Sequence, residues 1–298
     1  MSAGMDGAPS QRVSAVIVNY NARHHLLECV RSLREEGVND IVVADNDSRD
    51  GSAEALARDH GDVVFLPTGA NLGYGAAANR GAARCAGELL LVCNPDVTFE
   101  PGALKSLVAA IDTDDRLALV GPRIEGADGS LYPSPRTFPA IGDALGHAFL
   151  GLVAPGNAFT RRYRMLDWDR GRASDVDWVS GSCFLARRPA WDALGGFDER
   201  YFMYAEDVDL CWRAWRAGWK VGFEPAARVV HVQGVSTDLV AYRMVLAHHR
   251  SLLRFSYRST TGWRRALLPL VTAGLALRAV LACAQRAGRR RRRRGPAR

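Results

Sequence analysis

Short runs of apolar residues alternate with amphipathic segments along the first 124 residues. The first run, residues 13–19 (VSAVIVN), is continuously apolar up to its polar end, which is typical of a buried strand in a parallel sheet. A helix is predicted over residues 23–36, and the alternation then repeats. The further predicted strands are residues 40–44, 63–66, 88–93 and 117–121, and the further predicted helices are residues 53–59, 76–85 and 101–111. This order predicts a doubly wound α/β sheet whose ligand crevice lies at the carboxyl ends of its strands.

Residues 125–172 interrupt this alternation. They combine proline, glycine, arginine and aromatic residues without a regular period, which favours a long functional loop region over a linker. Regular patterns then return: residues 178–188 and 220–224 predict strands, and residues 189–194 and 205–217 predict helices. We therefore expect one domain over residues 13–240, with residues 13–124 and 125–240 as its two halves.

The C-terminal segment has a different pattern. A long helix is predicted from residue 239 to about residue 257, and residues 266–283 form an apolar stretch that contains Arg278. A stretch of this length with an arginine near its middle is a poor bilayer span but suits an interfacial helix. Residues 241–285 are therefore expected to form helices that lie on a membrane surface.

Composition narrows the class of protein. The 298 residues are 48% hydrophobic and 24% charged, and the six cysteines include no C-x-x-C pair, which indicates a globular protein with reduced thiols. The first eleven residues lack the basic and apolar pattern of an export signal. Residues 1–12 are therefore predicted to be a disordered start, and the catalytic part is predicted to be cytoplasmic.

Positive charge is concentrated near the C-terminus. The net charge is +7, and residues 264–298 carry eleven arginines and no acidic residue, which leaves −4 for residues 1–263. A nucleic-acid-binding domain spreads basic residues over its folded surface, so this distribution argues against nucleic acid as a partner. The arginine-rich tail, residues 286–298, instead predicts attraction to anionic lipid, with a solvated disordered tail as the alternative.

Polar side chains follow the predicted strands at the edge where the ligand crevice is expected. Asp45 and Asn46 come directly after a strand, where the Asp45 carboxylate could accept hydrogen bonds from a nucleobase or a ribose; helix capping is the alternative. In NLGYG, Asn71 and Gly73 precede a helix whose N-terminus suits a phosphate or a ribose. A turn without a ligand explains that loop equally well, because its spacing matches no phosphate-binding glycine motif.

Two polar residues follow the strand predicted over residues 88–93. Asn94 and Asp96 lie two residues apart, and Pro95 holds the backbone between them extended, so their side chains point the same way. Together they could hold Mg²⁺ or Mn²⁺ between two phosphates, although a single carboxylate would depend on the phosphates of the substrate. A plain Asn-Pro turn is the alternative.

Further titratable groups occur in the second half. Asp207 shares a helix face with apolar residues at offsets of +3, +4 and +7, so its carboxylate is expected to point inward, where it could act as a general base. Asp209 precedes Arg213 by four residues and is explained as a helix-surface pair. His231 follows two valines and is either a metal ligand or a core histidine.

Seven segments in this order resemble the family 2 inverting glycosyltransferases with a GT-A fold. The segments are VIVNYN, DNDSRDGS, NLGYGAAANRG, LLLVCNPD, VSGSCFLARR, GGFDERYFMYAEDVDLCWRAWRAGW and HVQGVS. The resemblance covers about residues 13–240 and implies a Rossmann-like, mostly parallel α/β sheet flanked by helices. It also implies a nucleotide-diphosphosugar donor and a single in-line displacement that inverts the anomeric configuration.

The resemblance assigns roles to the residues described above. Asp207 would take the proton of the acceptor, with Glu206 as the second candidate, while Asp96 and His231 would bind a divalent cation, Mg²⁺ or Mn²⁺. Asn94 stands where many relatives have the first aspartate of an Asp-x-Asp motif, which puts metal affinity in doubt. The expected donor-binding residues are Asn19, Asp45, Asn46, Asn71, Gly73, Asn79, Asn94 and Asp96.

Within the family, the chain looks most like the bacterial rhamnosyltransferases that move L-rhamnose from dTDP-rhamnose to an N-acetylglucosaminyl-diphospho-polyprenol in the assembly of cell-wall or surface polysaccharide. The residues that fit the acceptor side of such relatives are Arg136, Trp178, Gly181 and Ser182. The residues expected near a lipid diphosphate, with a solvated loop as the alternative, are Arg161, Arg162 and Arg164. A membrane-embedded acceptor would explain an arginine-rich tail that holds the protein at the inner face of the plasma membrane.

Other functions stay open on the sequence. The transferred sugar could instead be galactofuranose, glucose or mannose. A nucleotidyltransferase would need a glycine-rich signature near the first strand, which VIVNYNARHH lacks. The presence of Asp96, Asp207 and His231 argues against a non-catalytic homologue that only binds a nucleotide sugar or a lipid. The apolar C-terminal helix could also serve a homodimer instead of a membrane.

Overall fold

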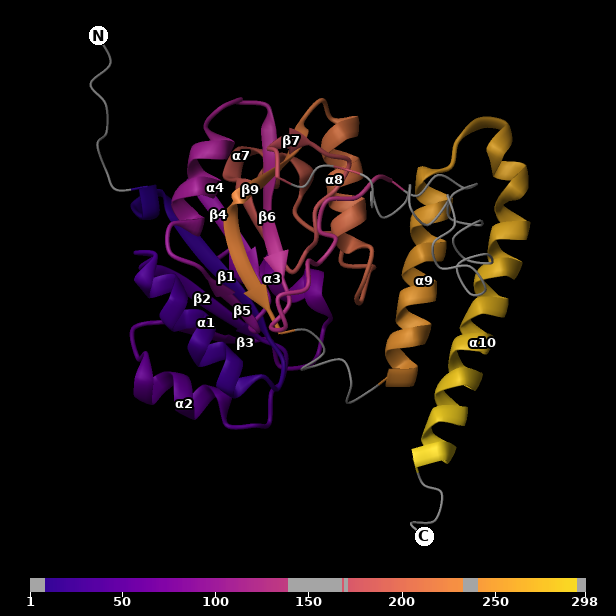
Figure 1. Cartoon of the computed structure of the whole chain (residues 1–298), viewed down its shortest axis with the longest axis horizontal. Coiled ribbons are helices and arrows are strands. Elements are labelled where there is room, and N and C mark those ends of the chain that lie inside the picture. Colours follow the sequence, from indigo (N-terminus) through magenta and orange to yellow (C-terminus); the bar gives the residue numbers. More distant parts are fainter. Residues whose placement is uncertain (1–8, 139–167, 169–170, 233–240, 294–298) are drawn as a thin grey trace.

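The apolar runs of the first half form neighbouring parallel strands, because a helix after each strand returns the chain to the same edge of the sheet. The computed structural model describes residues 9–138, 168, 171–232 and 241–293, and within them one nine-stranded sheet has the order β3-β2-β1-β4-β8-β6-β9-β5, with β7 paired to β9 (Figure 1). The strands are β1 (Val13–Asn19), β2 (Asp40–Asp45), β3 (Val64–Pro67), β4 (Leu89–Cys93), β5 (Val97–Phe99), β6 (Leu117–Glu125), β7 (Ser174–Asp175), β8 (Cys183–Arg187) and β9 (Lys220–His231).

The pairing of the strands divides the sheet into two halves. Strands β3, β2, β1 and β4 pair in parallel. Strand β8 then runs antiparallel to both β4 and β6, and β9 pairs in parallel with β6 and antiparallel with β5 and β7. The parallel character expected from the sequence thus belongs to the first half, and the second half is mixed.

Helices cover both faces of the sheet. Along β1, Val13, Ala15 and Ile17 pack against α1 and α4, whereas Val16 and Val18 join a second apolar cluster with α3, α7 and α8. This strand is buried on both sides, which is why it is continuously apolar. The helices are α1 (Arg23–Glu35), α2 (Ser52–Asp59), α3 (Tyr74–Ala82), α4 (Ala103–Ile111), α7 (Arg188–Leu194), α8 (Glu206–Arg216), α9 (Ala241–Ser259) and α10 (Leu268–Arg293), with 3₁₀ helices η1 (Pro9–Arg12) and η3 (Gly262–Leu267).

Several boundaries differ from the sequence-based expectation. The last residues of the expected disordered start form η1, and the predicted strand over residues 178–188 is regular only from Cys183 to Arg187. Helix α10 continues to Arg293, into the segment expected to be a separate arginine-rich tail. Residues 1–8, 139–167 and 294–298 lie outside the described residues, and with them Arg161, Arg162 and Arg164.

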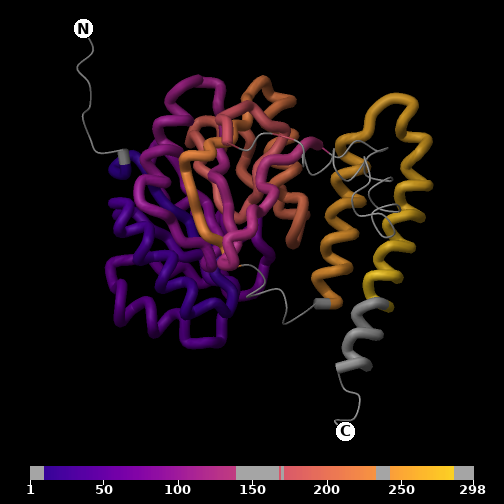
Figure 2. The backbone as a smooth tube through the Cα atoms, viewed as in Figure 1, coloured from indigo at the N-terminus to yellow at the C-terminus, as the bar shows by residue number. Residues whose placement is uncertain are grey.

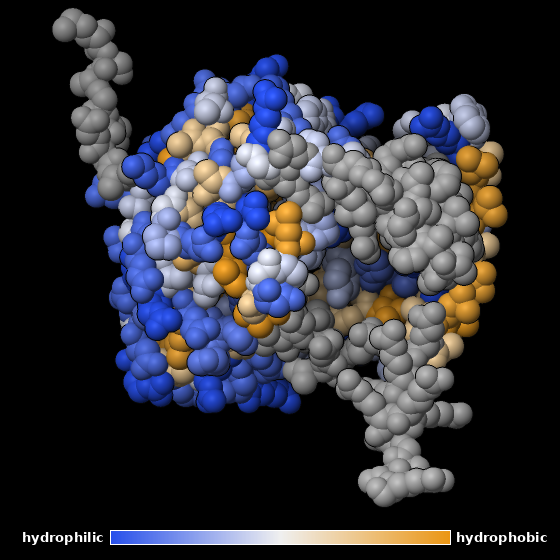
Figure 3. All heavy atoms as spheres, in the orientation of Figure 1, coloured by the Kyte–Doolittle hydropathy of each residue, from blue (hydrophilic) through white to orange (hydrophobic). Residues whose placement is uncertain are grey.

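The two C-terminal helices form an antiparallel hairpin beside the domain (Figure 2). Helix α9 packs on the domain through buried Met244 and Phe255, and α10 packs along α9. The outer face of α10 is apolar and exposed, as at Leu270 and Val280, which are 60% and 65% exposed (Figure 3). Among the described residues, one helical segment, Gly262–Ala284, has the length and apolar composition needed to cross a membrane.

Candidate active site

A cavity of about 380 Å³ opens at the carboxyl ends of β1 and β4, next to the start of α8. Its walls come from both halves of the domain and from α9. The predicted site residues that line it are Asn46, Asn71, Asn94, Asp96, Arg136, Trp178, Gly181, Ser182, Glu206, Asp207 and His231. The structure therefore brings together most of the residues singled out in the sequence, as expected for the carboxyl edge of an α/β sheet.

Asp207 lies in the first turn of α8 with its carboxylate fixed from two sides. Oδ2 accepts a hydrogen bond from the Gly181 N–H at 2.8 Å, and Oδ1 accepts one from the Val208 N–H at 2.8 Å. A side chain at position 181 would approach the Asp207 Cβ to 3.1 Å, so glycine there permits the close contact. Burial raises the pKa of Asp207, and the two backbone hydrogen bonds partly oppose that shift.

Glu206 lies beside Asp207 in a different environment. Its side chain is buried, and its Oε2 has no hydrogen-bond partner among the described residues. Burial and the negative charge of Asp207 both raise the pKa of Glu206 well above its usual range. Two adjacent carboxyl groups with different partners suit different protonation states, with the proton on Glu206 and the charge on Asp207.

Asp96 and His231 meet on the opposite wall of the cavity. Strand β5 pairs with β9 in a register that places Val97 opposite His231, and this pairing brings His231 Nε2 to 3.1 Å from Asp96 Oδ1. Asn94 Nδ2 lies 3.3 Å from the same His231 nitrogen. No cluster of three or more histidine, cysteine or acidic side chains suited to a metal occurs in the described part of the chain. The protein thus offers two good metal ligands here.

The predicted donor residues fall into two groups. Asn46 and Asn71 line the cavity, and Asn46 also holds the loop before α3, because its Nδ2 donates to the Gly73 carbonyl at 3.1 Å. Asp45 and Asn19 lie behind this wall, where Asn19 Nδ2 donates to Asp45 Oδ1 at 2.7 Å. The Asn19 Oδ1 is buried without a hydrogen-bond partner among the described residues.

Two sequence-based assignments look different in the structure. Asn79 does not line the cavity; its side chain donates to the Phe197 carbonyl at 2.9 Å and accepts from the Phe197 N–H at 2.9 Å, which ties α3 to the loop before α8. The surface location expected for Asp209 is wrong. Asp209 is fully buried, and Arg213 and Arg258 both form ion pairs with it.

The expected acceptor residues form a stacked wall. The Arg136 guanidinium lies 5.0 Å from the ring centre of Trp178, and the backbones of the two residues pair. The Trp178 indole N–H donates to the Thr137 carbonyl at 3.0 Å, which fixes the ring plane. Trp178 is 5% exposed, so the buried indole holds Arg136 at the cavity wall, where the guanidinium can donate hydrogen bonds to a sugar.

Part of the cavity comes from helix α9, which sequence reasoning assigned to the membrane surface alone. Met244, His248 and Leu252 lie four residues apart on α9 and line the cavity opposite the sheet. Ser251 of the same helix donates to the Met203 carbonyl at 2.9 Å, which anchors α9 beside the start of α8. The spacing of these residues predicts a buried helix face, but nothing local indicates which cavity that face borders.

Gly73→Ala is expected to destabilise the fold by about 2–4 kcal/mol. A methyl group at Gly73, where φ is +91°, would lie 2.1 Å from the Phe202 carbonyl oxygen, which itself accepts the Tyr74 N–H. Gly69→Ala is the matched control, because Gly69 has φ +81° but no heavy atom of the described residues within 4 Å of a new methyl group. Urea unfolding measures both losses; an equal loss in the two variants would contradict the role of the Phe202 contact.

Comparison with known proteins places this geometry in a family. Residues 14–191 match the model described as glycosyl transferase family 2, and residues 156–286 match glycosyl transferase family group 2. The chain is 41% identical to an N-acetylglucosaminyl-diphospho-decaprenol L-rhamnosyltransferase of Mycobacterium tuberculosis, over 93% of this chain and 95% of the relative. It is 27% identical to the rhamnosyltransferase WbbL of Escherichia coli, over 48% of this chain and 52% of that protein.

Solved structures agree on the fold. The mannosyltransferase PcManGT from Pyrobaculum calidifontis, solved with GDP-Man and Mn²⁺, superposes with a TM-score of 0.56 at 16% identity, over 92% of this chain and 75% of that one. Staphylococcus aureus TarS 1–349 in complex with UDP gives a TM-score of 0.53 at 15% identity, over 89% and 70%. The family model spans more than half of the chain, and the mycobacterial relative matches nearly its full length. This chain therefore belongs to glycosyl transferase family 2 and is a glycosyltransferase with a GT-A-like fold.

Proposed function

We propose that this glycosyltransferase moves L-rhamnose from dTDP-rhamnose to an N-acetylglucosaminyl-diphospho-polyprenol and inverts the anomeric configuration. The observation that carries the proposal is the 41% identity to the mycobacterial L-rhamnosyltransferase along 95% of that relative, which includes both halves of the domain and the C-terminal helices. A second relative, at lower identity, is also named a rhamnosyltransferase.

Asp207 is the general base in this proposal. The acceptor hydroxyl loses its proton to the Asp207 carboxylate while its oxygen attacks the anomeric carbon, and the bond from that carbon to the nucleoside diphosphate breaks. The hydrogen bonds from Gly181 and Val208 leave lone pairs on both oxygens and hold the carboxylate in one orientation. Burial and the charge of Asp207 raise the pKa of Glu206, which favours its neutral form beside the charged base.

Asp96 and His231 are the side chains that would hold a divalent cation. The Asp96 Oδ1 and the His231 Nε2 lie close enough together to bind one Mg²⁺ or Mn²⁺ ion. The remaining ligands of such an ion would come from a diphosphate and from water. When bound, the cation offsets negative charge on the departing diphosphate. Asn46 and Asn71 would contact the donor directly, Asp45 and Asn19 would support the nucleoside side of the cavity, and Arg136 and Trp178 would face the acceptor sugar.

A donor screen tests the substrate assignment. The full chain is incubated with Mg²⁺ and a synthetic N-acetylglucosaminyl-diphospho-lipid, and the release of dTDP, UDP and GDP from dTDP-rhamnose and other nucleotide sugars is followed, with Asp207→Asn as the control. Acceptor-dependent release of dTDP from dTDP-rhamnose alone supports the proposal. Release of UDP or GDP instead would contradict the assignment of rhamnose as the transferred sugar. Release that does not depend on the acceptor would contradict the assignment of the lipid-linked acceptor.

We also propose that residues 241–298 keep the enzyme at the cytoplasmic face of the membrane. The support is the exposed apolar face of α10 together with the arginines of its C-terminal part and of the residues after it. We expect the full chain to sediment with vesicles that contain phosphatidylglycerol, and to do so about tenfold less when the vesicles contain only phosphatidylcholine. Equal sedimentation with both kinds of vesicle would contradict an electrostatic contribution of the arginines to membrane binding. Dimerisation without vesicle binding would assign the apolar face of α10 to contact with a second copy of the chain.

A further inference from the structure

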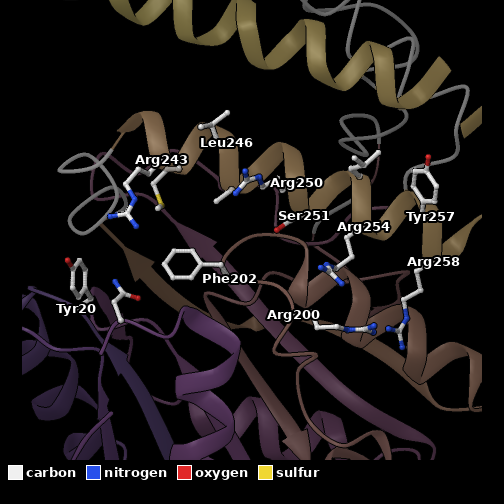
Figure 4. Close-up of a pocket in the computed structure, with 14 residues that line it drawn as sticks. Tyr20, Arg200, Phe202, Arg243, Leu246, Arg250, Ser251, Arg254, Tyr257 and Arg258 are labelled. Carbon is white, nitrogen blue, oxygen red and sulfur yellow. The ribbon is translucent and has the colours of Figure 1, made fainter. Parts of the chain in front are cut away.

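A second, larger cavity lies between α9 and the domain. It has a volume of about 1300 Å³, and five arginines contribute to its walls (Figure 4). Arg243, Arg250, Arg254 and Arg258 follow one another on α9 at offsets of 0, 7, 11 and 15, which places them on one face of the helix. Arg200 faces them from the loop before α8. We call this cavity the arginine cleft.

The arginine cleft carries uncompensated positive charge. Among the described residues that line the cleft, none is an aspartate or a glutamate. Two of its arginines are neutralised from behind: Arg200 and Arg258 both pair with Asp198, and Arg258 also pairs with Asp209. In the described part of the chain, Arg243, Arg250 and Arg254 form no ion pair. Arg254 lies over the Tyr201 ring, with its guanidinium carbon 5.8 Å from the ring centre, and this contact leaves its N–H groups available. Three guanidinium groups that have no carboxylate partner among the described residues suit an anion.

Apolar side chains lie between these charges. Phe202, Met244, Leu253 and Tyr257 line the same cleft, and Phe202 and Tyr257 are 36% and 49% exposed. A site for a free inorganic anion gains nothing from exposed aromatic and aliphatic groups, whereas a site for an anion with a hydrocarbon chain does. The mixture of residues therefore indicates an amphiphilic anion.

The arginine cleft adjoins the catalytic cavity. Asn71, Phe202 and Met244 line both. Helix α9 presents Met244, His248 and Leu252 to the catalytic cavity and the arginines to the cleft from the adjoining face. The cleft is therefore next to the site where the sugar of an acceptor would meet Asp207.

We propose that Arg243, Arg250 and Arg254 bind the diphosphate of the lipid-linked acceptor, with the first isoprene units against Phe202, Leu253 and Tyr257. This inference rests on the proposed function for the identity of the acceptor, not for the chemistry of the cleft. A diphosphate is also present in the nucleotide donor. The acceptor is the better match for two reasons. The donor diphosphate is already assigned to the proposed cation site at Asp96 and His231, and a nucleotide has no hydrocarbon chain to contact the apolar residues of the cleft.

Binding measurements on the full chain in detergent test the cleft without relying on turnover. The probes are farnesyl diphosphate, farnesol, and dTDP with Mg²⁺, followed by calorimetric titration. The variant is Arg250→Gln/Arg254→Gln, and the matched control is Arg31→Gln/Arg84→Gln, which removes two exposed arginines outside the cleft. Unchanged thermal unfolding of both variants confirms that they fold.

We expect the cleft variant to bind farnesyl diphosphate about a hundredfold more weakly than the wild-type chain, which is about tenfold for each lost charge-assisted contact. The affinity of the control variant for farnesyl diphosphate, and the affinity of both variants for dTDP, should stay within about threefold of the wild-type values. A loss of dTDP affinity instead would assign the cleft to the donor, and an equal loss for farnesol or no loss at all would overturn a diphosphate site. If the losses follow the proposal but no rhamnose is transferred, the cleft assignment stands and the proposed sugar is wrong.

Discussion

Asp207→Asn is expected to lower acceptor-dependent turnover by about a thousandfold, because the amide cannot take the acceptor proton. The affinity for dTDP should stay within about twofold, since the change leaves the donor side of the cavity intact. In the asparagine variant one of the two N–H groups, that of Gly181 or that of Val208, can still donate to the amide oxygen, while the other loses its acceptor. Rates of dTDP release and calorimetric titration with dTDP measure the two effects.

Glu206→Gln is the matched variant for this prediction. Because burial and the Asp207 charge raise the pKa of Glu206, the neutral glutamine resembles the protonated side chain, and turnover should fall less than about tenfold. The pH profile gives a further check. Burial raises the pKa of Asp207, and protonation removes the base, so the rate should drop as pH falls through a pKa above the usual aspartate range. A severe loss in Glu206→Gln with an active Asp207→Asn would reverse the two roles.

Asp96→Ala is expected to reduce turnover by about 10²–10³-fold through the loss of charge stabilisation on the departing diphosphate. The same substitution should weaken Mn²⁺ binding in the presence of dTDP, measured by electron paramagnetic resonance independently of turnover. His231→Ala should act in the same direction, because His231 Nε2 and Asp96 Oδ1 lie 3.1 Å apart and share the site.

Asn94→Asp serves as the opposing variant. Asn94 Nδ2 already lies 3.3 Å from His231 Nε2, so a carboxylate at this position should add a third ligand and tighten Mn²⁺ binding. Mn²⁺ affinity that is the same in the wild-type chain, Asp96→Ala and Asn94→Asp would show that the metal binds elsewhere.

The local sequence pattern was sufficient for the first half of the fold and for most of the site. Strand β1 is apolar at successive positions because both of its faces are buried, and such a run predicts a central strand without knowledge of its neighbours. Its polar successors lie at the carboxyl edge because parallel strands share that edge. Asp96 could be selected for this reason and Asp207 from its place on the apolar face of a helix, and the structure places both in one cavity.

Residues whose roles depend on distant partners could not be assigned in this way. Asp209 looks like half of a surface pair, but Arg258, 49 positions later in the chain, also pairs with it and permits its burial. Asn79 looks like a ligand-binding residue in a glycine-rich segment, yet its hydrogen bonds to Phe197 join helix α3 to the loop before α8. Strand β5 has only three residues and offers too little pattern to predict.

The sequence by itself determined most of the segments that become strands and helices and which chemical groups stand at their ends, because hydrophobic periodicity and chain order are local properties. Only the tertiary structure decided which groups meet. The β5–β9 register sets His231 against Asp96, and the packing of α9 on the domain closes the catalytic cavity and forms the arginine cleft. These arrangements depend on contacts between residues far apart in the chain, whose free energies arise only when the elements pack together.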